Sequence, residues 1–189
     1  MEEIVVGQVI ISKQEEYYEN YQRFRKIVKE KNIKVLIVEK CNLLEIEENV
    51  YIDILWPNES NLIRENCLNN NSIVCKICYN DFSMLFTGDI EEIAERHILQ
   101  KYSDDLQKLR STLLKVGHHG SKTSSIQEFI NVINPKIALI GVGKNNKFGH
   151  PNKQVIDRLQ NNGVKVFRTD LDGEVSIFVD RNGKMKIHI

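Results

Sequence analysis

Histidines and an aspartate that lie directly beside glycines are the residues of this chain that could do chemistry. His118 and His119 are adjacent and lie between two glycines, and Asp89 and His150 each follow a glycine. Imidazole and carboxylate groups are the ligands that zinc and similar first-row divalent metals take in proteins. Glycine lets the backbone approach a ligand closely, because it has no Cβ. The pattern therefore predicts a site for a metal ion, built on short loops.

Strands are the elements that must position these side chains. Apolar segments over 83–87, 112–116 and 137–142 precede the loops that carry Asp89, the histidine pair and His150. Ligands of α/β sheets bind outside the carboxyl ends of the strands. We therefore expect Asp89, the adjacent histidines and His150 to meet at one rim of a sheet.

Two of these residues also have a purely structural interpretation. Glu92 follows Asp89 by three residues, which is the spacing of a helix capping box. His150 precedes Pro151, so it could be the N-cap of a helix that has proline at its first position. Both alternatives stay open on sequence alone. Adjacent histidines at a strand end are an unusual way to fill a core, which favours a functional role for that pair.

The order of the predicted elements indicates an α/β (layered α+β) protein, in which helices partly cover a sheet. We expect further strands over 5–11, 35–38, 50–56, 73–79, 164–167, 175–179 and 185–189. We expect helices over 15–31, 90–100, 125–133 and 151–160, and a short helical stretch over 105–108. Ser125 and Glu128 predict a capping box at the third of these helices.

Composition limits the class of protein. The chain has 189 residues, of which 41% are hydrophobic, and this is enough for one domain over residues 1–189. Its 26 basic residues balance its 26 acidic residues, which excludes a whole-chain basic field for nucleic acid. There is no apolar run of about 18–20 residues and no basic leader. The expectation is a cytoplasmic protein that makes no membrane contact of its own.

Cys75 and Cys78 form a Cys-x-x-Cys sequence that could suggest zinc or redox chemistry. They lie in an apolar, β-branched segment, and positions three apart on a strand point to opposite faces. There is no second Cys-x-x-Cys among the four cysteines. We therefore expect structural thiols on opposite faces of the sheet.

The motifs together resemble those of metallo-β-lactamase-fold hydrolases. More closely, they resemble the C-terminal domain of the bacterial DNA-uptake competence protein ComEC and its free-standing relatives. The resemblance covers nearly the whole chain, with its motifs in the same order. The matching segments are residues 51–57, 70–74, 82–89, 114–124, 145–151 and 168–170.

The resemblance implies an αββα sandwich with a two-metal site at one edge, holding zinc or manganese. It implies that Asp89 bridges the metals and that His118 is a further ligand. His119 and His150 would then be catalytic residues near the substrate. Four further residues are expected to bind the substrate, namely Asn71, Ser121, Lys122 and Asn146. Residues 121–124 are expected to open a helix whose amide groups could hold a phosphate oxygen.

The chain departs from the family in one respect. The family's His-x-His-x-Asp-His motif supplies most of the metal ligands, and this chain has no histidine before His97. The resemblance is therefore to the later part of the sandwich, a partial domain. We expect only two protein ligands, Asp89 and one of the adjacent histidines, with His118 favoured over His119, and these cannot build a tight two-metal site in one chain.

The functional expectation is a metal-dependent hydrolase, phosphodiesterase- or nuclease-like and related to competence DNA uptake, that is weak or inactive as this chain. The alternatives are a non-catalytic nucleic-acid- or partner-binding remnant of the fold, and one half of a split hydrolase. A non-catalytic binding domain predicts that Lys115, Lys122, Lys144 and Lys147 cluster. Expected partners are DNA or another phosphodiester, with a choline-phosphate ester as the second choice. A homo-oligomer or the missing N-terminal half of the domain is also expected, and the parent family domain is attached to a membrane protein.

Overall fold

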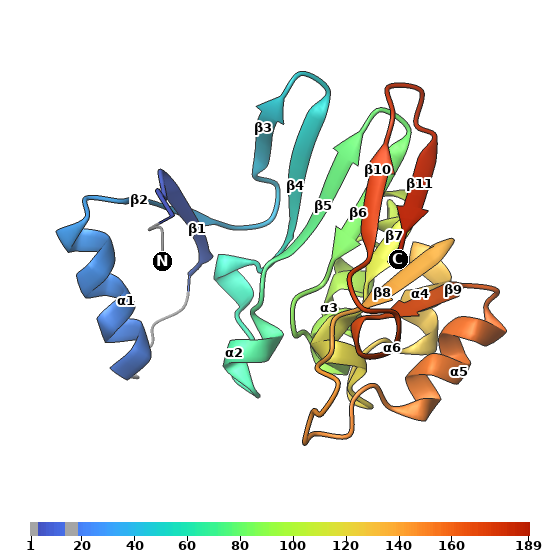
Figure 1. Ribbon diagram of the computed structural model, residues 1–189. Helices are drawn as coiled ribbons and strands as arrows, with labels where there is room; N and C mark the ends of the chain where they lie inside the picture. The colour runs from blue at the N-terminus through green and yellow to red at the C-terminus, as the bar shows by residue number, and fades with distance from the viewer. Residues whose placement is uncertain (1–3, 14–18) are drawn as a thin grey trace.

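The first structural unit consists of two strands and one helix. The structure, a computed structural model, describes residues 4–13 and 19–189 (Figure 1). Strands β1 (Gln8–Ser12) and β2 (Lys34–Val38) pair in parallel, and α1 (Glu19–Glu30) connects them. The first residues of the helix expected over 15–31 fall in the range 14–18, outside the described residues. Within Glu19–Glu30 no residue of the helix is buried.

A seven-stranded sheet carries the rest of the fold, with its strands in sequence order (Figure 1). Pairing is antiparallel from β3 to β6 and parallel from β6 to β9. The carboxyl ends of β6, β7, β8 and β9 therefore lie at the same edge. The strands are β3 (Leu43–Glu47), β4 (Val50–Trp56), β5 (Val74–Tyr79), β6 (Phe82–Phe86), β7 (Leu113–Lys115), β8 (Ile137–Ile140) and β9 (Lys165–Arg168).

Helices cover one face of this sheet. The apolar sides of α3 (Glu92–Lys101), α4 (Gln127–Ile133) and α5 (Lys153–Asn161) share one core with the strands. That core includes Ala94, Ile98, Leu114, Phe129, Ile130, Ala138, Ile140, Val155 and Leu159. Short helical segments complete the connections, namely α2 (Cys67–Asn70), α6 (Thr169–Asp172) and the turns Glu59–Asn61 and Leu106–Leu109. Among the helices that the structure describes, none is long and apolar enough to cross a membrane.

A hairpin packs on the opposite face. Strands β10 (Ser176–Val179) and β11 (Met185–His188) pair antiparallel. Their side chains pack with Leu113, Ile137 and Phe167 of the large sheet in a second, smaller core. The sheet thus has helices on one side and strands on the other, and the expected α/β class with layered helices is confirmed.

A carboxylate from another helix holds the N-terminus of α4, and the predicted capping box is wrong. The N-cap of α4 is Ile126, and Ser125 has a left-handed φ of 57°. Instead, the Glu95 carboxylate of α3 accepts hydrogen bonds from the backbone N–H groups of Ser125 (2.5 Å) and Ile126 (2.8 Å). Burial raises the pKa of Glu95 to about 7, although both amides and Arg158 oppose the shift.

Cys75 and Cys78 both lie on β5, as expected. Successive side chains of a strand alternate between faces, so the two thiols point to opposite sides of the sheet. Both cysteines are free and partly buried. Burial raises the pKa of Cys75 to about 11 and also raises the pKa of Cys78. The thiols are therefore protonated at neutral pH, which suits packing rather than metal binding.

Candidate functional site at the carboxyl edge of the sheet

The loops after β6, β7 and β8 bring the predicted site residues together. The backbone N–H of His118 donates to the carbonyl of Gly88 at 3.0 Å, which ties the loop after β7 to the loop after β6. The Thr87 hydroxyl donates to the carbonyl of Lys115 at 2.8 Å. In Figure 1 this edge is the lower edge of the large sheet, above α6. Parallel pairing of β6, β7 and β8 explains why residues far apart in sequence meet here.

Asp89 and His119 form one acid–histidine pair. Nε2 of His119 lies 3.7 Å from Oδ1 of Asp89, and the side chains are 50% and 44% exposed. Nδ1 of His119 lies 2.6 Å from the carbonyl oxygen of Gly141. A carbonyl oxygen only accepts, so Nδ1 must carry the hydrogen in this geometry. In the neutral ring, Nε2 then has a lone pair at a position open to a ligand.

Glu91 and His118 form a second pair that is less exposed. Nδ1 of His118 lies 3.4 Å from Oε1 of Glu91, at side-chain exposures of 22% and 17%. This nitrogen is buried and has no hydrogen-bond partner among the residues that the structure covers. The Glu91 carboxylate is held in place, because it accepts from the Thr123 hydroxyl and from the Asn66 amide, both at 2.8 Å.

Sequence reasoning missed Glu91, which lies two residues after Asp89. Its backbone N–H donates to Oδ1 of Asn70 at 3.0 Å, and Asn70 itself is fully buried. Glu91 is also the N-cap position of α3, so the interpretation of Asp89 as a helix cap is wrong. The one sequence signal for Glu91 was a second carboxylate close to Asp89 in Gly-Asp-Ile-Glu.

His150 completes the group of histidines. Its ring centroid lies 5.6 Å from that of His118, at an interplanar angle of 65°. Burial lowers the pKa of His150, as do the neighbouring His118 and His119, while Asp89 opposes the shift. The N-cap of α5 is Asn152, which accepts from the backbone N–H of Gln154 at 3.0 Å. The interpretation of His150 as the helix cap is therefore wrong.

Lys115 adds a cation beneath the site. Its ammonium group donates to the carbonyl of Val116 at 3.1 Å. Its side chain packs beside Gly141, where a Cβ would lie 3.4 Å from Cε of Lys115. Burial lowers the pKa of Lys115, and the charge of Asp89 opposes the shift.

Asn71, which was expected to bind the substrate, is buried and bonds the backbone around it. The side chain is 2% exposed, and Oδ1 accepts from the backbone N–H of Ile63 at 2.9 Å. Its amide donates to the carbonyls of Ile63 and Cys67, both at 2.8 Å. With these bonds made inside the fold, Asn71 has a structural role in place of the predicted substrate contact.

The other predicted substrate residues lie nearer the rim. Ser121 is buried, with its hydroxyl 3.0 Å from that of Thr123, whereas Lys122 is exposed. The helix expected to open at Ser121 begins only at Gln127, so the predicted phosphate-binding helix terminus is wrong. Asn146 braces the loop before α5, since its side chain bonds both the carbonyl (2.7 Å) and the N–H (3.0 Å) of His150.

The carboxylates and histidines at this edge are suitable metal ligands, but too few of those described surround any one point. Carboxylates and imidazoles suit zinc or manganese, and Nδ1 of His118 is a buried ring nitrogen that makes no hydrogen bond within the described structure. Within the described part of the chain, however, no group of three or more potential ligand residues is placed to hold one ion. The residues present therefore do not by themselves fit a two-metal centre.

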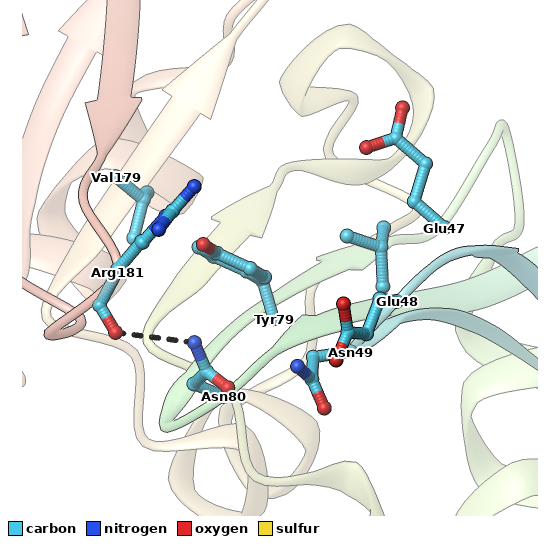
Figure 2. A pocket seen from close by; sticks show the side chains of 8 residues that line it. Glu47, Glu48, Asn49, Tyr79, Asn80, Val179 and Arg181 are labelled. Atoms are coloured by element: carbon cyan, nitrogen blue, oxygen red, sulfur yellow. Dashed lines mark hydrogen bonds between the residues drawn. The ribbon is translucent and has the colours of Figure 1, made fainter.

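Two cavities differ in their relation to this edge. One, of about 360 Å³, adjoins the site and is lined by His119, Gly141, Val142, Gly143, Asn146, Phe148, His150 and Thr169. The other, of about 680 Å³, lies at the turns of the hairpins (Figure 2) and is lined by Glu47, Glu48, Asn49, Val50, Tyr79, Asn80, Val179 and Arg181. In the second, the Asn80 amide donates to the carbonyl of Arg181 at 3.2 Å. The first cavity is the one that shares residues with the histidine group.

Comparison with curated proteins finds sequence similarity to bacterial competence proteins, while no family model matches. The chain is 30% identical to ComE operon protein 3 of Bacillus subtilis (strain 168) over 161 residues, which are 85% of the chain and 20% of that protein. It is 33% identical to competence protein ComA of Neisseria gonorrhoeae over 136 residues, which are 72% of the chain and 19% of that protein. The chain thus spans about a fifth of the length of these relatives.

Comparison with solved structures identifies the fold. CmlA, a diiron beta-hydroxylase from Streptomyces venezuelae, matches with a TM-score of 0.57 at 13% identity, over 86% of this chain and 38% of that one. The E377D mutant of CmlA matches with a TM-score of 0.54. Both have the metallo-β-lactamase fold. The chain therefore has a metallo-β-lactamase-like fold, and its sequence is similar to one part of bacterial competence proteins.

Proposed function

We propose that this chain supplies one wall of a metal-dependent phosphodiester-hydrolysing site in a protein of competence DNA uptake, and that the chain alone is weak or inactive. The main support is that two carboxylates, Asp89 and Glu91, lie beside three histidines at one edge of the sheet. The histidines are His118, His119 and His150. The similarity to competence proteins supports the setting. In such a setting the substrate is DNA.

Each residue has a role in this proposal. Asp89 and His118 are metal ligands, since one is an exposed carboxylate and the other has an unpartnered ring nitrogen. His119 and His150 contact the substrate, because both line the adjoining cavity. A divalent metal would polarise the phosphoester and supply a hydroxide nucleophile. The ligands seen here are too few for us to assign any catalytic step.

The remaining ligands are proposed to come from outside this chain, either from the other part of the domain or from a second copy. The β1–β2 unit supports this, because a two-stranded sheet is rarely stable by itself. Its strands leave apolar side chains uncovered, with Ile10 38%, Val35 37% and Ile37 53% exposed. A further sheet layer would cover them.

Zinc titration followed by NMR of the histidine rings tests the proposal. We expect zinc to shift the ring signals of His118 and His119, while those of His188, on β11, stay in place as an internal control. Asp89→Asn should weaken zinc binding by about tenfold or more. Asp157→Asn, which removes an exposed carboxylate paired with Lys153 on α5, is the matched control.

Elemental mass spectrometry after dialysis separates the outcomes. We expect less than one tightly held metal per chain, since no complete ligand group is present in the described ranges. Two metals per chain would contradict the proposed incompleteness. No zinc-dependent shift at His118 or His119 would contradict the metal site and would favour the alternative of a non-catalytic binding domain.

A further inference from the structure

An aromatic ring stands open to solvent beside the candidate site. Phe148 is 82% exposed. Its ring stacks on that of His150, with centroids 6.1 Å apart and planes inclined by 20°. One face of the phenyl ring is therefore occupied, and the other is free. A single exposed apolar side chain is common on protein surfaces, so the argument for binding rests on what surrounds the ring.

The loop that presents Phe148 is held in place by hydrogen bonds. Asn146 bonds the backbone of His150 on both sides, through its amide and its oxygen. At the start of the loop, the Thr169 hydroxyl accepts from the N–H of Val142 at 2.7 Å and donates to its carbonyl at 2.8 Å. The ring is therefore a preorganised platform.

The surroundings of the ring determine what could stack on it. Phe148 forms one wall of the cavity of about 360 Å³, and His119 and His150 form other parts of it. Lys144 and Lys147 lie in the same loop and are exposed. A flat apolar group that enters the cavity would thus meet Phe148 on a loop that also carries two exposed lysines, beside the histidines of the proposed site.

We propose that Phe148 is a stacking platform for one unpaired base of a single-stranded nucleic acid, with Lys144 and Lys147 contacting the adjacent phosphates. This inference rests on the proposed function and names its substrate class. Bases in a duplex are already stacked, so only an unpaired base can place its face on a protein ring. Stacking on an aromatic side chain tolerates any base, because every base has a π face.

Binding measurements without metal test this inference independently of catalysis. The probes are a fluorescently labelled oligothymidylate of about ten nucleotides and an abasic strand of the same length, in EDTA at low salt. The two strands have equal charge and differ only in their bases. We expect the chain to bind the oligothymidylate about tenfold more tightly than the abasic strand.

Variants assign the preference to the ring. Phe148→Ala should lose about tenfold in affinity for the oligothymidylate and little for the abasic strand, and Phe148→Trp should keep the preference. Lys144→Gln with Lys147→Gln should weaken both strands. Phe178→Ala is the matched control, because Phe178 is also exposed, at 60%, but lies on β10. Its affinities should be unchanged.

The outcomes distinguish the two proposals. Equal affinity for both strands, or an equal loss in Phe148→Ala and Phe178→Ala, would overturn the stacking platform even where zinc still shifts the site histidines. A base preference that depends on Phe148 in a chain that binds no zinc would support the platform and contradict the metal-dependent function.

Discussion

The carboxylate of Glu91 lies 3.4 Å from Nδ1 of His118, a buried nitrogen that makes no hydrogen bond within the described structure. The carboxylate itself is fixed by Thr123 and Asn66. The hydrogen bonds from Thr123 and Asn66 thereby hold the Glu91 carboxylate beside the ring of His118. His118 also has a left-handed φ of 46°, which only tertiary contacts can maintain in a residue other than glycine. Glu91 is thus a positioning residue for the histidine pair.

Replacing Glu91 by alanine should destabilise the fold. The change removes the carboxylate that accepts hydrogen bonds from the Thr123 hydroxyl and the Asn66 amide. A hydrogen bond to a charged group contributes about 1.5–3 kcal/mol to stability. We expect a loss of about 2 kcal/mol in the free energy of unfolding, measured with urea. Glu92→Ala is the control, since the Glu92 side chain is 53% exposed and pairs with Arg96 on the same helix. An equal, small effect of both variants would contradict the positioning role.

The buried Glu95 should make stability depend on pH. Its folded-state pKa of about 7 lies above the ordinary value of 4.5, so folding favours the protonated form. The stabilisation from the protonated form is complete below about pH 4.5 and is lost as pH rises to about 7. The shift in pKa corresponds to a change of about 3 kcal/mol in the free energy of unfolding across this pH window.

Comparison with Glu95→Gln isolates this effect. The neutral amide cannot ionise, so the difference in unfolding free energy between wild type and variant should fall across this pH window. Arg158 and Glu92 are the neighbouring charges that modulate Glu95. Glu128→Gln removes an exposed carboxylate from α4 and serves as control. A difference that does not change between about pH 4.5 and pH 7 would show that folding does not raise the pKa of Glu95.

Local patterns were sufficient to predict the strands that carry the site. The segment Val50–Trp56 alternates and ends at Pro57, and β4 has the same bounds. The junctions after β6, β7 and β8 were predicted because glycine next to histidine or aspartate is a local signal. By contrast, β3 was missed, since Leu43–Glu47 is a short segment with two glutamates on an edge strand.

Contacts between distant residues could not be predicted. Asn66 forms a hydrogen bond with Glu91, which lies 25 positions away in the sequence. Glu95 accepts a hydrogen bond from Ser125, which lies 30 positions away. Local spacing suggested capping boxes at two helix starts and His150 as the N-cap of a third helix, yet Glu91, Ile126 and Asn152 are the N-caps. In each case a tertiary partner or a neighbouring residue satisfies the backbone, which a local pattern cannot show.

Alanine at Gly88 should disturb the loop that holds Asp89. Gly88 has a φ of 54°, and a Cβ built there lies 2.6 Å from Cβ of Ser72. The left-handed backbone costs about 1–2 kcal/mol and the overpacking about 1–3 kcal/mol. We expect Gly88→Ala to lower the free energy of unfolding by at least about 2 kcal/mol in urea. A Cβ at Gly7 meets nothing within 4 Å, so Gly7→Ala should be nearly neutral. A nearly neutral Gly88→Ala would mean that the loop can relax away from Ser72.

The four cysteines should differ in their rate of alkylation. Burial raises the pKa values of Cys75 and Cys78, and only the thiolate reacts with iodoacetamide. Cys41 and Cys67 are exposed. Mass spectrometry of the folded chain at mildly alkaline pH should therefore show rapid modification of Cys41 and Cys67 and slow modification of the β5 pair. In denaturant all four should react at similar rates, which controls for local sequence. Protection of Cys75 and Cys78 that disappears with a chelator, while the fold persists, would instead indicate a metal held by this pair and would contradict their placement on opposite faces of β5.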